Sequence, residues 1–377
     1  MEEYLNTEYC EFENDASASS FGWNFQSNAG IFLFLSFFKQ AEEIKIESKL
    51  QDIEITLNNG EKVLAQAKSS QDYSVDKSKK QKFKDAIISL AKYSKKGNSF
   101  IYISNIPNTL DSGKELFNNE IISYNECLQA VKNEIDDVFV STSNSIKKQV
   151  DKETNLDKLK KLKTILELVE SFDKSKLYIS VIDRFFGEDK HRYSAVSDKI
   201  IAFLVDDLKL NRDDAISIKT KLLDFWQLSF QHNSTIPDKG IKKSINKNDF
   251  AWPIVVYLTE ECIPDIDECL TFNPDKALKK EVFHALSYSE VLYHERFSFT
   301  NRIIQDYNDF RKEKRGISNI EKAFVKECGH NYYDEFKKDS IDDETLEYIT
   351  KAFIYKIIID RNNMSKISAG IGAKNDN

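Results

Sequence analysis

The fold is decided by residues 51–68, which read QDIEITLNNGEKVLAQAK. Polar and apolar side chains alternate on both sides of the Asn-Asn-Gly break, a pattern typical of two strands joined by a tight turn. A three-residue loop from Asn58 to Gly60, with Gly60 in the left-handed conformation, would pair Leu57 with Glu61. A two-residue loop would mix the two faces, so the hydrophobic pattern predicts the three-residue hairpin.

This register separates the hairpin into an apolar face and a polar face. The apolar face collects Ile53, Ile55, Leu57, Val63, Ala65 and Ala67. The polar face places Asp52 opposite Gln66, with Lys68 and Glu54 on the same side, at cross-strand distances of about 5 to 8 Å. A carboxylate, an amide oxygen and the carbonyl of Ala67 are hard oxygen ligands of the kind that Mg²⁺ prefers. The pattern therefore predicts a metal site at Asp52 and Gln66, where Lys68 would hold and activate the attacking water.

The flanking segments predict a mixed α/β core. Residues 24–44 are apolar on nearly every side, which indicates a helix covered by the rest of the protein. A short alternating run at 42–47 predicts a first strand, and a lysine-rich helix at 79–95 leads to a strand at 98–104. We therefore expect a mixed sheet flanked by helices, with its core at about residues 15–110.

Beyond this core the chain is mainly helical by its spacing of apolar residues. Helical patterns cover residues 113–135, 156–169, 195–208, 213–230 and most of 249–359, with a strand-like run at 176–183. The stretch 232–248 contains Pro237 and Gly240 and predicts a linker. The expected domains are residues 1–235, with a helical elaboration at 111–235, then a helical regulatory or partner-docking domain at 250–365 and a flexible tail at 366–377.

Composition excludes several classes of protein. The chain has 377 residues, 41% of them hydrophobic, so it can bury a sizeable core. Its 11 Gly and 5 Pro exclude collagen-like and Pro-rich chains, and a formal net charge of −8 restricts any nucleic-acid surface to a local patch. Five scattered cysteines indicate free thiols. The acidic start, and a longest apolar run (29–38) too short to span a bilayer, predict a cytoplasmic protein without a membrane partner.

The site residues resemble a known nuclease motif. Asp52 followed by QAK at 66–68 resembles the catalytic motif of the PD-(D/E)XK superfamily, in the variant with Gln in the last motif. Residues 22–26, GWNFQ, resemble the start of the first helix in Mrr-like nucleases, and Glu47 stands where these enzymes often carry an acidic residue. The spacing resembles the nuclease domain shared by CBASS effector nucleases and the A subunit of Lamassu defence complexes. Chain length and the helical C-terminal half favour the Lamassu subunit.

The resemblance implies an endonuclease that cuts double-stranded DNA with Mg²⁺, or with Mn²⁺ in its place. It assigns catalytic roles to Glu47, Asp52, Gln66 and Lys68, with Gln26 and Glu54 in support. It also implies an SMC-like ATPase and a small third subunit as partners, with cutting after release and self-association into a homo-oligomer. Gln51 stands where a second Asp is common and Gln26 where Mrr-like enzymes have Glu, which leaves open whether one metal or two are used.

Several alternatives remain open from the sequence. Lys77, Lys79 and Lys80, at the start of the second helix, are candidate DNA contacts or a solvated helix face. For the whole protein the sequence allows three interpretations. It is a nuclease, or a catalytically inactive scaffold or DNA-binding subunit with the same fold, or a nuclease gated by a cyclic nucleotide bound to its C-terminal half. Cysteine and histidine spacings match no usual zinc site.

Overall fold

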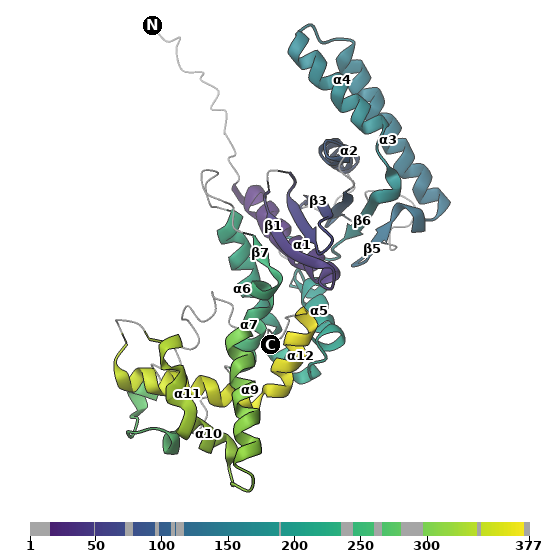
Figure 1. Ribbon diagram of the computed structural model, residues 1–377. Helices are drawn as coiled ribbons and strands as arrows, with labels where there is room; N and C mark the ends of the chain where they lie inside the picture. Colours follow the sequence, from purple (N-terminus) through teal and green to yellow (C-terminus); the bar gives the residue numbers. More distant parts are fainter. Residues whose placement is uncertain are drawn as a thin grey trace, which may run out of the picture. The chain divides into compact units, whose positions relative to one another are not determined.

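The structure is a computed structural model that describes residues 16–48, 50–71, 78–94, 98–106, 110, 117–187, 190–234, 244–259, 266–279, 297–337 and 341–372. Its strands are β1 (Ala41–Ile46), β2 (Ile53–Leu57), β3 (Lys62–Lys68), β4 (Ser99–Ser104), β5 (Ile121–Ser123), β6 (Leu177–Val181) and β7 (Ile245–Asn246). They form one seven-stranded sheet in the order β5-β6-β4-β3-β2-β1-β7 (Figure 1). The sheet is mixed, because β4 and β6 are parallel while β1 and β2 are antiparallel. This confirms a mixed sheet flanked by helices.

The helices are α1 (Ala16–Phe37), α2 (Ser78–Ala91), α3 (Gln129–Val150), α4 (Leu156–Glu170), α5 (Ser194–Ala202), α6 (Arg212–Ser234), α7 (Lys247–Thr259), α9 (Phe297–Glu313), α10 (Ile320–Cys328), α11 (Asp343–Ile359) and α12 (Arg361–Ile371). The C-terminal region is helical, as expected. Among the described helices, none has both the length and the hydropathy that a membrane span requires.

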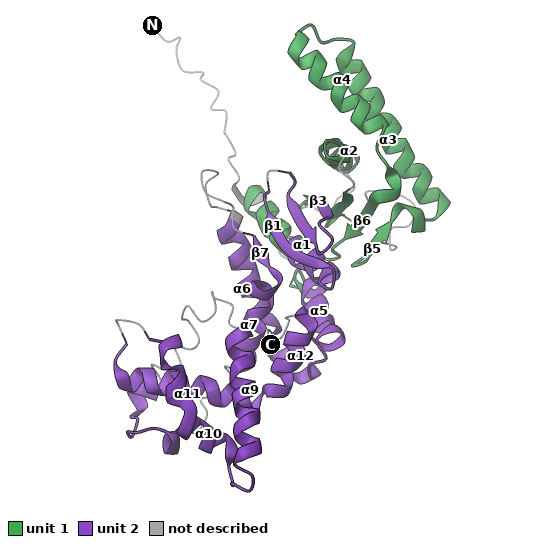
Figure 2. Ribbon diagram, in the orientation of Figure 1, with its two compact units in different colours: residues 1–29, 65–193 green, residues 30–64, 194–377 purple. Residues whose placement is uncertain are grey.

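Contacts group the chain into two compact units, one of residues 1–29 and 65–193 and one of residues 30–64 and 194–377 (Figure 2). Two of the three boundaries between them fall inside α1 and β3, and the third falls between Tyr193 and Ser194, where α5 begins. The domains predicted from the sequence, 1–235 and 250–365, are instead divided at a predicted linker. Their boundaries stay a prediction.

The three-residue hairpin loop between β2 and β3 is confirmed. The N–H of Leu57 donates to the carbonyl of Glu61 at 2.8 Å, and Gly60 has a φ of +81°. On the predicted apolar face, Ile53, Ile55, Val63 and Ala65 are buried, whereas Leu57 and Ala67 are half-buried. Glycine is needed at this loop position because a side chain is strained at that φ.

The N-terminal helix is shifted from the predicted one. The apolar density of residues 24–44 predicts a continuous helix, whereas α1 begins at Ala16 and ends at Phe37. A turn follows, in which the N–H of Gln40 donates to the carbonyl of Phe37 at 2.8 Å. The chain from Ala41 then pairs with β2, because strand pairing buries Ile44 and Ile46 at alternate positions.

The predicted helix at 113–135 is wrong over its described first half. Ile121–Ser123 forms β5, which pairs antiparallel with β6. Ser123 then caps a short 3-10 helix by accepting the N–H of Glu126, while the Glu126 side chain accepts the N–H of Ser123. This capping box stops the strand, and α3 starts only at Gln129.

Two further differences lie in the unit of residues 30–64 and 194–377. Residues 245–246, inside the predicted linker, form β7 and pair with β1. The predicted tail begins inside α12, where Met364, Ile367 and Ile371 are buried. These positions repeat at helical spacing and form an apolar face that is too sparse to stand out in the sequence.

Candidate functional site

Glu47 and Asp52 meet at the end of the β1–β2 hairpin. The N–H of Glu47 donates to the carbonyl of Asp52 at 2.7 Å, so strand pairing continues one residue beyond Ile46. Residues directly opposite each other in an antiparallel pair are close neighbours. The hairpin therefore brings together two carboxylate-bearing residues that the sequence singled out.

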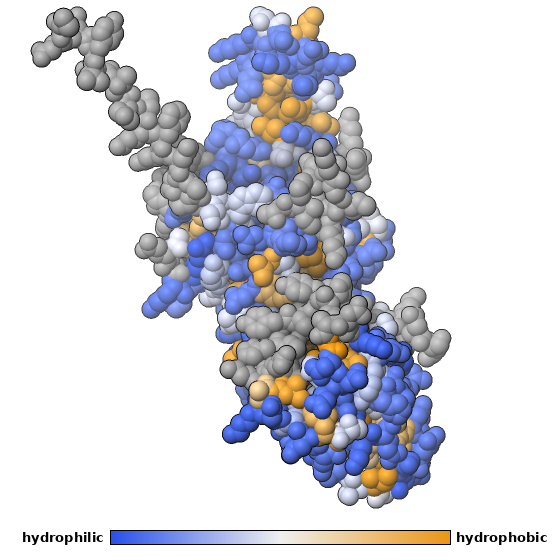
Figure 3. All heavy atoms as spheres, turned by 90° about the vertical axis from the view of Figure 1, so that its left-hand side faces the viewer, coloured by the Kyte–Doolittle hydropathy of each residue, from blue (hydrophilic) through white to orange (hydrophobic). Residues whose placement is uncertain are grey.

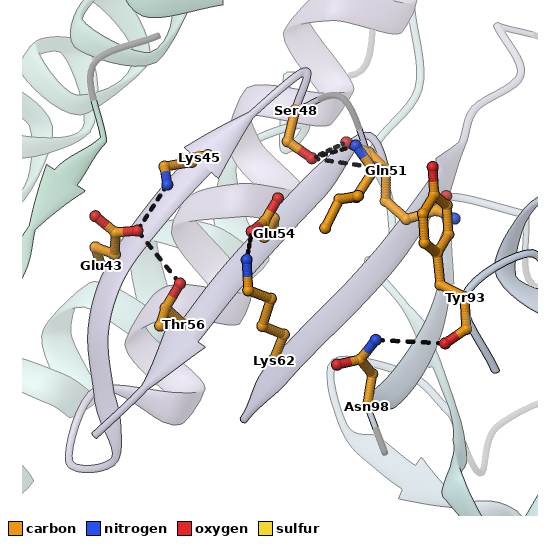
Figure 4. Close-up of polar contacts among 10 residues, drawn as sticks. Glu43, Lys45, Ser48, Gln51, Glu54, Thr56, Lys62, Tyr93 and Asn98 are labelled. Carbon is orange, nitrogen blue, oxygen red and sulfur yellow. Dashed lines mark hydrogen bonds and ion pairs between the residues drawn. The ribbon is translucent and has the colours of Figure 1, made fainter. Parts of the chain in front are cut away.

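The turn between them is held by its own serine. Ser48 Oγ accepts the N–H groups of Leu50 and Gln51, both at 3.0 Å, and donates to the carbonyl of Gln51 at 3.1 Å (Figure 4). Such a hydroxyl-to-backbone turn supplies locally the hydrogen bonds that the strands no longer provide. The backbone of Glu47 and Asp52 is thus fixed by local contacts.

Glu47 has an unusual backbone conformation, with a φ of +52°. Side chains larger than glycine rarely adopt this region, and doing so costs about 1 to 2 kcal/mol. Residues held in such conformations cluster at functional sites, where the surrounding structure maintains them. The conformation of Glu47 is independent of the motif that first drew attention to this residue.

Glu54 lies on the polar face of β2 and is nearly buried, with 4% of its surface exposed. Its carboxylate forms an ion pair with Lys62 of β3 (Figure 4). The two residues are diagonal neighbours in the register set by the three-residue loop. Because a lysine already neutralises this carboxylate, the contact favours a structural role for Glu54.

Glu43 of β1 is another carboxylate on this sheet that is already paired. Lys45 forms an ion pair with it at 2.8 Å, and Thr56 Oγ1 donates to it at 3.3 Å (Figure 4). Burial raises the pKa of Glu43, but hydrogen bonds from Lys45 and Ser244 outweigh it, so the pKa lies below its usual value. Glu43 therefore stays ionised and bound to its neighbours.

Gln66 and Lys68 lie on β3, in the unit of residues 1–29 and 65–193. Gln66 is buried and Lys68, the last residue of the strand, is half-buried. Just beyond it, Asn105 donates to the carbonyl of Ser70 at 2.7 Å and accepts its N–H at 2.9 Å. Asn105 is fully buried and anchors the chain that leaves Lys68. Asn105 was not among the predicted site residues, although its position as a polar residue directly after the strand at 98–104 was a usable signal.

The lysines of the second helix divide between structure and surface. Lys82 Nζ donates to the carbonyl of Ser69 at 2.6 Å and so fixes α2 to the end of β3. Lys80 is exposed on α2, the side chain of Lys79 lies outside the described part, and Lys77 lies wholly outside it. DNA contact by these lysines stays a prediction.

The motif at 22–26 lies in α1. Gln26 is buried, and Asn24 Oδ1 accepts hydrogen bonds from Arg192 at 3.0 Å and from the hydroxyl of Tyr193 at 3.2 Å. The guanidinium of Arg192 also lies 4.6 Å from the ring centre of Phe21. Asn24 thus holds a cation against α1. Local sequence patterns could not predict this contact, because 168 positions separate the partners.

The structure brings Glu47 and Asp52 together within one unit, and it places Gln66, Lys68 and Gln26 in the other. Among the described residues, no group of three or more His, Cys, Asp and Glu side chains has a metal-binding arrangement. The predicted ligand set differs from such a group, because it combines carboxylates with an amide and a backbone carbonyl.

Comparison of the chain with protein-family models, curated proteins and solved structures found no match. The resemblance to PD-(D/E)XK nucleases therefore rests on residues of this sequence. Asp52, Gln66 and Lys68 carry it, together with Glu47 and the 22–26 motif.

Proposed function

We propose that this protein is a Mg²⁺-dependent endonuclease that cuts double-stranded DNA as the effector of a bacterial defence complex. The observation that carries the proposal is the pairing of Glu47 with Asp52 at the end of the β1–β2 hairpin. It joins a carboxylate that the motif requires to a second one held in a strained backbone conformation. A PD-(D/E)XK fold for the sheet is part of the same proposal.

The ligand set follows from the register at the β2–β3 loop. The register predicted from the sequence, continued along both strands from the three-residue loop, assigns Gln66 as the partner of Asp52. We assign Asp52, Gln66 and the carbonyl of Ala67 as Mg²⁺ ligands, with Glu47 supporting the metal or its water. All are oxygen donors, which fits Mg²⁺ or Mn²⁺. Bound there, the cation would neutralise phosphate charge and make a bound water more acidic.

Lys68 has a separate role in this mechanism. Its ammonium group would orient the attacking water and neutralise the charge that develops as the phosphorus becomes five-coordinate. The anchoring of Ser69 by Lys82 and of Ser70 by Asn105 supports this role, because it fixes the backbone next to Lys68. Gln26, buried on α1, is a supporting residue in the proposal.

The test is plasmid cleavage with Mg²⁺ by the wild type, Asp52→Asn and Lys68→Ala, with EDTA as a further arm. Lys326→Ala, at an exposed lysine of α10, is the matched control. We expect Asp52→Asn and Lys68→Ala to lose at least about 100-fold in rate, and the control to match the wild type. Cleavage that survives EDTA or Lys68→Ala would contradict the proposed site.

The same experiment separates the alternatives. A wild type that never cuts, either alone or with an SMC-like ATPase and a small third subunit, would favour an inactive scaffold. A thermal shift on adding cyclic nucleotides would favour gating by a nucleotide instead of by partner subunits.

A further inference from the structure

The helices α3 and α4 form a hairpin whose base is firmly packed. The ring of Phe172 lies 5.0 Å from that of Phe100 in β4 and 5.3 Å from that of Phe139 in α3. Val169, near the end of α4, is also buried. These aromatic contacts fix one end of the hairpin to β4, which belongs to the same unit.

The other end of the hairpin is exposed. From residue 147 to residue 168 no side chain is buried, and Leu156 is 81% exposed. Asn155 caps the start of α4 by accepting the N–H groups of Asp157 at 3.0 Å and Lys158 at 3.1 Å. The two helices lie side by side (Figure 1), so this end is an ordered arm. We call residues 147–163 the arm.

The arm is rich in positive charge although the whole chain is acidic. It carries seven lysines, Lys147, Lys148, Lys152, Lys158, Lys160, Lys161 and Lys163, against three acidic residues, Asp151, Glu153 and Asp157. All seven lysines are exposed, and the end of the hairpin is mainly hydrophilic in Figure 3. Lys147 is ion-paired with Glu170 at 2.8 Å, and the described part of the chain offers the other six no carboxylate partner.

We propose that the arm binds the phosphate backbone of DNA. On α4, Lys158 and Lys161 share one face and Lys160 and Lys163 share another, since residues three apart in a helix are neighbours. Such an array meets a surface of dense negative charge without reading bases. Duplex DNA is such a surface, because it presents one charge per about 1.7 Å of its axis. The inference deepens the proposed function and rests on it only for the choice of DNA as ligand.

A membrane surface fits the arm less well. A helix that lies in a membrane interface needs a free apolar face beside its basic residues. Leu156 is exposed, but Leu159, Leu162, Ile165 and Leu166 are each partly covered, and α4 packs along α3 and α2. The arm therefore presents seven exposed lysines and one exposed apolar residue, Leu156.

The test compares binding of a short fluorescent DNA duplex in EDTA, where no metal-dependent cleavage occurs. The arm variant is Lys158→Gln with Lys161→Gln and Lys163→Gln. Its control is Lys276→Gln with Lys326→Gln and Lys366→Gln, three lysines that are also exposed. Between about 50 and 200 mM salt, the logarithm of the association constant falls linearly with the logarithm of the salt concentration. We expect this dependence to become less steep by about 2 to 3 in the arm variant alone. The affinity of the arm variant for DNA at the lowest salt concentration should be at least about tenfold weaker than that of the wild type.

An unchanged slope in the arm variant, an equal loss in the control, or no binding of DNA by the wild type would each overturn the inference. Loss of binding to phosphatidylserine vesicles without loss of DNA binding would assign the arm to membranes instead. Circular dichroism of each variant checks that the helices persist. If DNA binds through the arm but is never cut, the proposed nuclease activity fails and the arm stands.

Discussion

At the scale of single residues, variants of Glu47 distinguish the cost of its backbone conformation from the role of its carboxylate. Its φ of +52° is favourable for glycine and costly for any other side chain. We expect the Glu47→Gly variant to be more stable than the Glu47→Ala variant, with a free energy of unfolding about 1 kcal/mol higher. Both variants lack the carboxylate, so both should lose cleavage. Urea denaturation and plasmid assays measure the two effects, and full cleavage by either variant would remove Glu47 from the site.

Gly60 gives a second residue-scale prediction. Its φ is +81°, and a Cβ added there would meet nothing within 4 Å, so the cost of Gly60→Ala is conformational and not steric. We expect a loss of about 1 kcal/mol in the free energy of unfolding, measured with urea. Gly187→Ala, at a glycine that does not have a positive φ, is the control. A Gly60→Ala variant as stable as the wild type would mean that the loop tolerates another conformation.

At the scale of elements, a buried ion pair joins α11 to the chain around Cys269. Lys351 Nζ donates to Glu347 at 2.7 Å and to the carbonyl of Cys269 at 2.8 Å, and Glu347 accepts the N–H of Thr271 at 2.8 Å. We expect Lys351→Met to lower the free energy of unfolding by about 3 to 5 kcal/mol, because it leaves a buried carboxylate uncompensated. Combining it with Glu347→Gln should cost less. Equal losses in the single and double variants would contradict this explanation.

The same pair gives a pH dependence. Burial raises the pKa of Glu347, but hydrogen bonds from Lys351 and Thr271 outweigh it, so the folded pKa lies below the ordinary 4.5. A lowered folded pKa contributes stability above the unfolded value, and that contribution is lost as pH falls through the folded value. Below pH 4.5 we expect Tm to fall more steeply for the wild type than for Glu347→Gln. Parallel Tm curves would contradict it.

At the scale of the whole molecule, the net charge affects DNA binding and so the control of cleavage by self-association. A net charge of −8 opposes tight DNA binding by one copy, whereas several copies would present several basic arms together. We expect cleavage per molecule to rise steeply with protein concentration, in step with self-association seen by mass photometry. A purified protein that cuts at its full rate at every concentration would contradict control by assembly.

The sequence by itself determined the β2–β3 hairpin. Alternation and a single Gly define a loop because both act between neighbours in the chain, and the bond from Leu57 to Glu61 follows. It also indicated the mixed sheet and the helical C-terminal region. The candidate residues Asp52, Gln66 and Lys68 came from the same local register, and their assembly into one site stays a prediction.

Only the tertiary structure decided the remaining features. The two-residue strand β7, the buried face of α12 and the contact of Arg192 with Asn24 join segments that are far apart in the chain. Short strands and sparse apolar faces carry little local signal, because their stability comes from the partner that covers them.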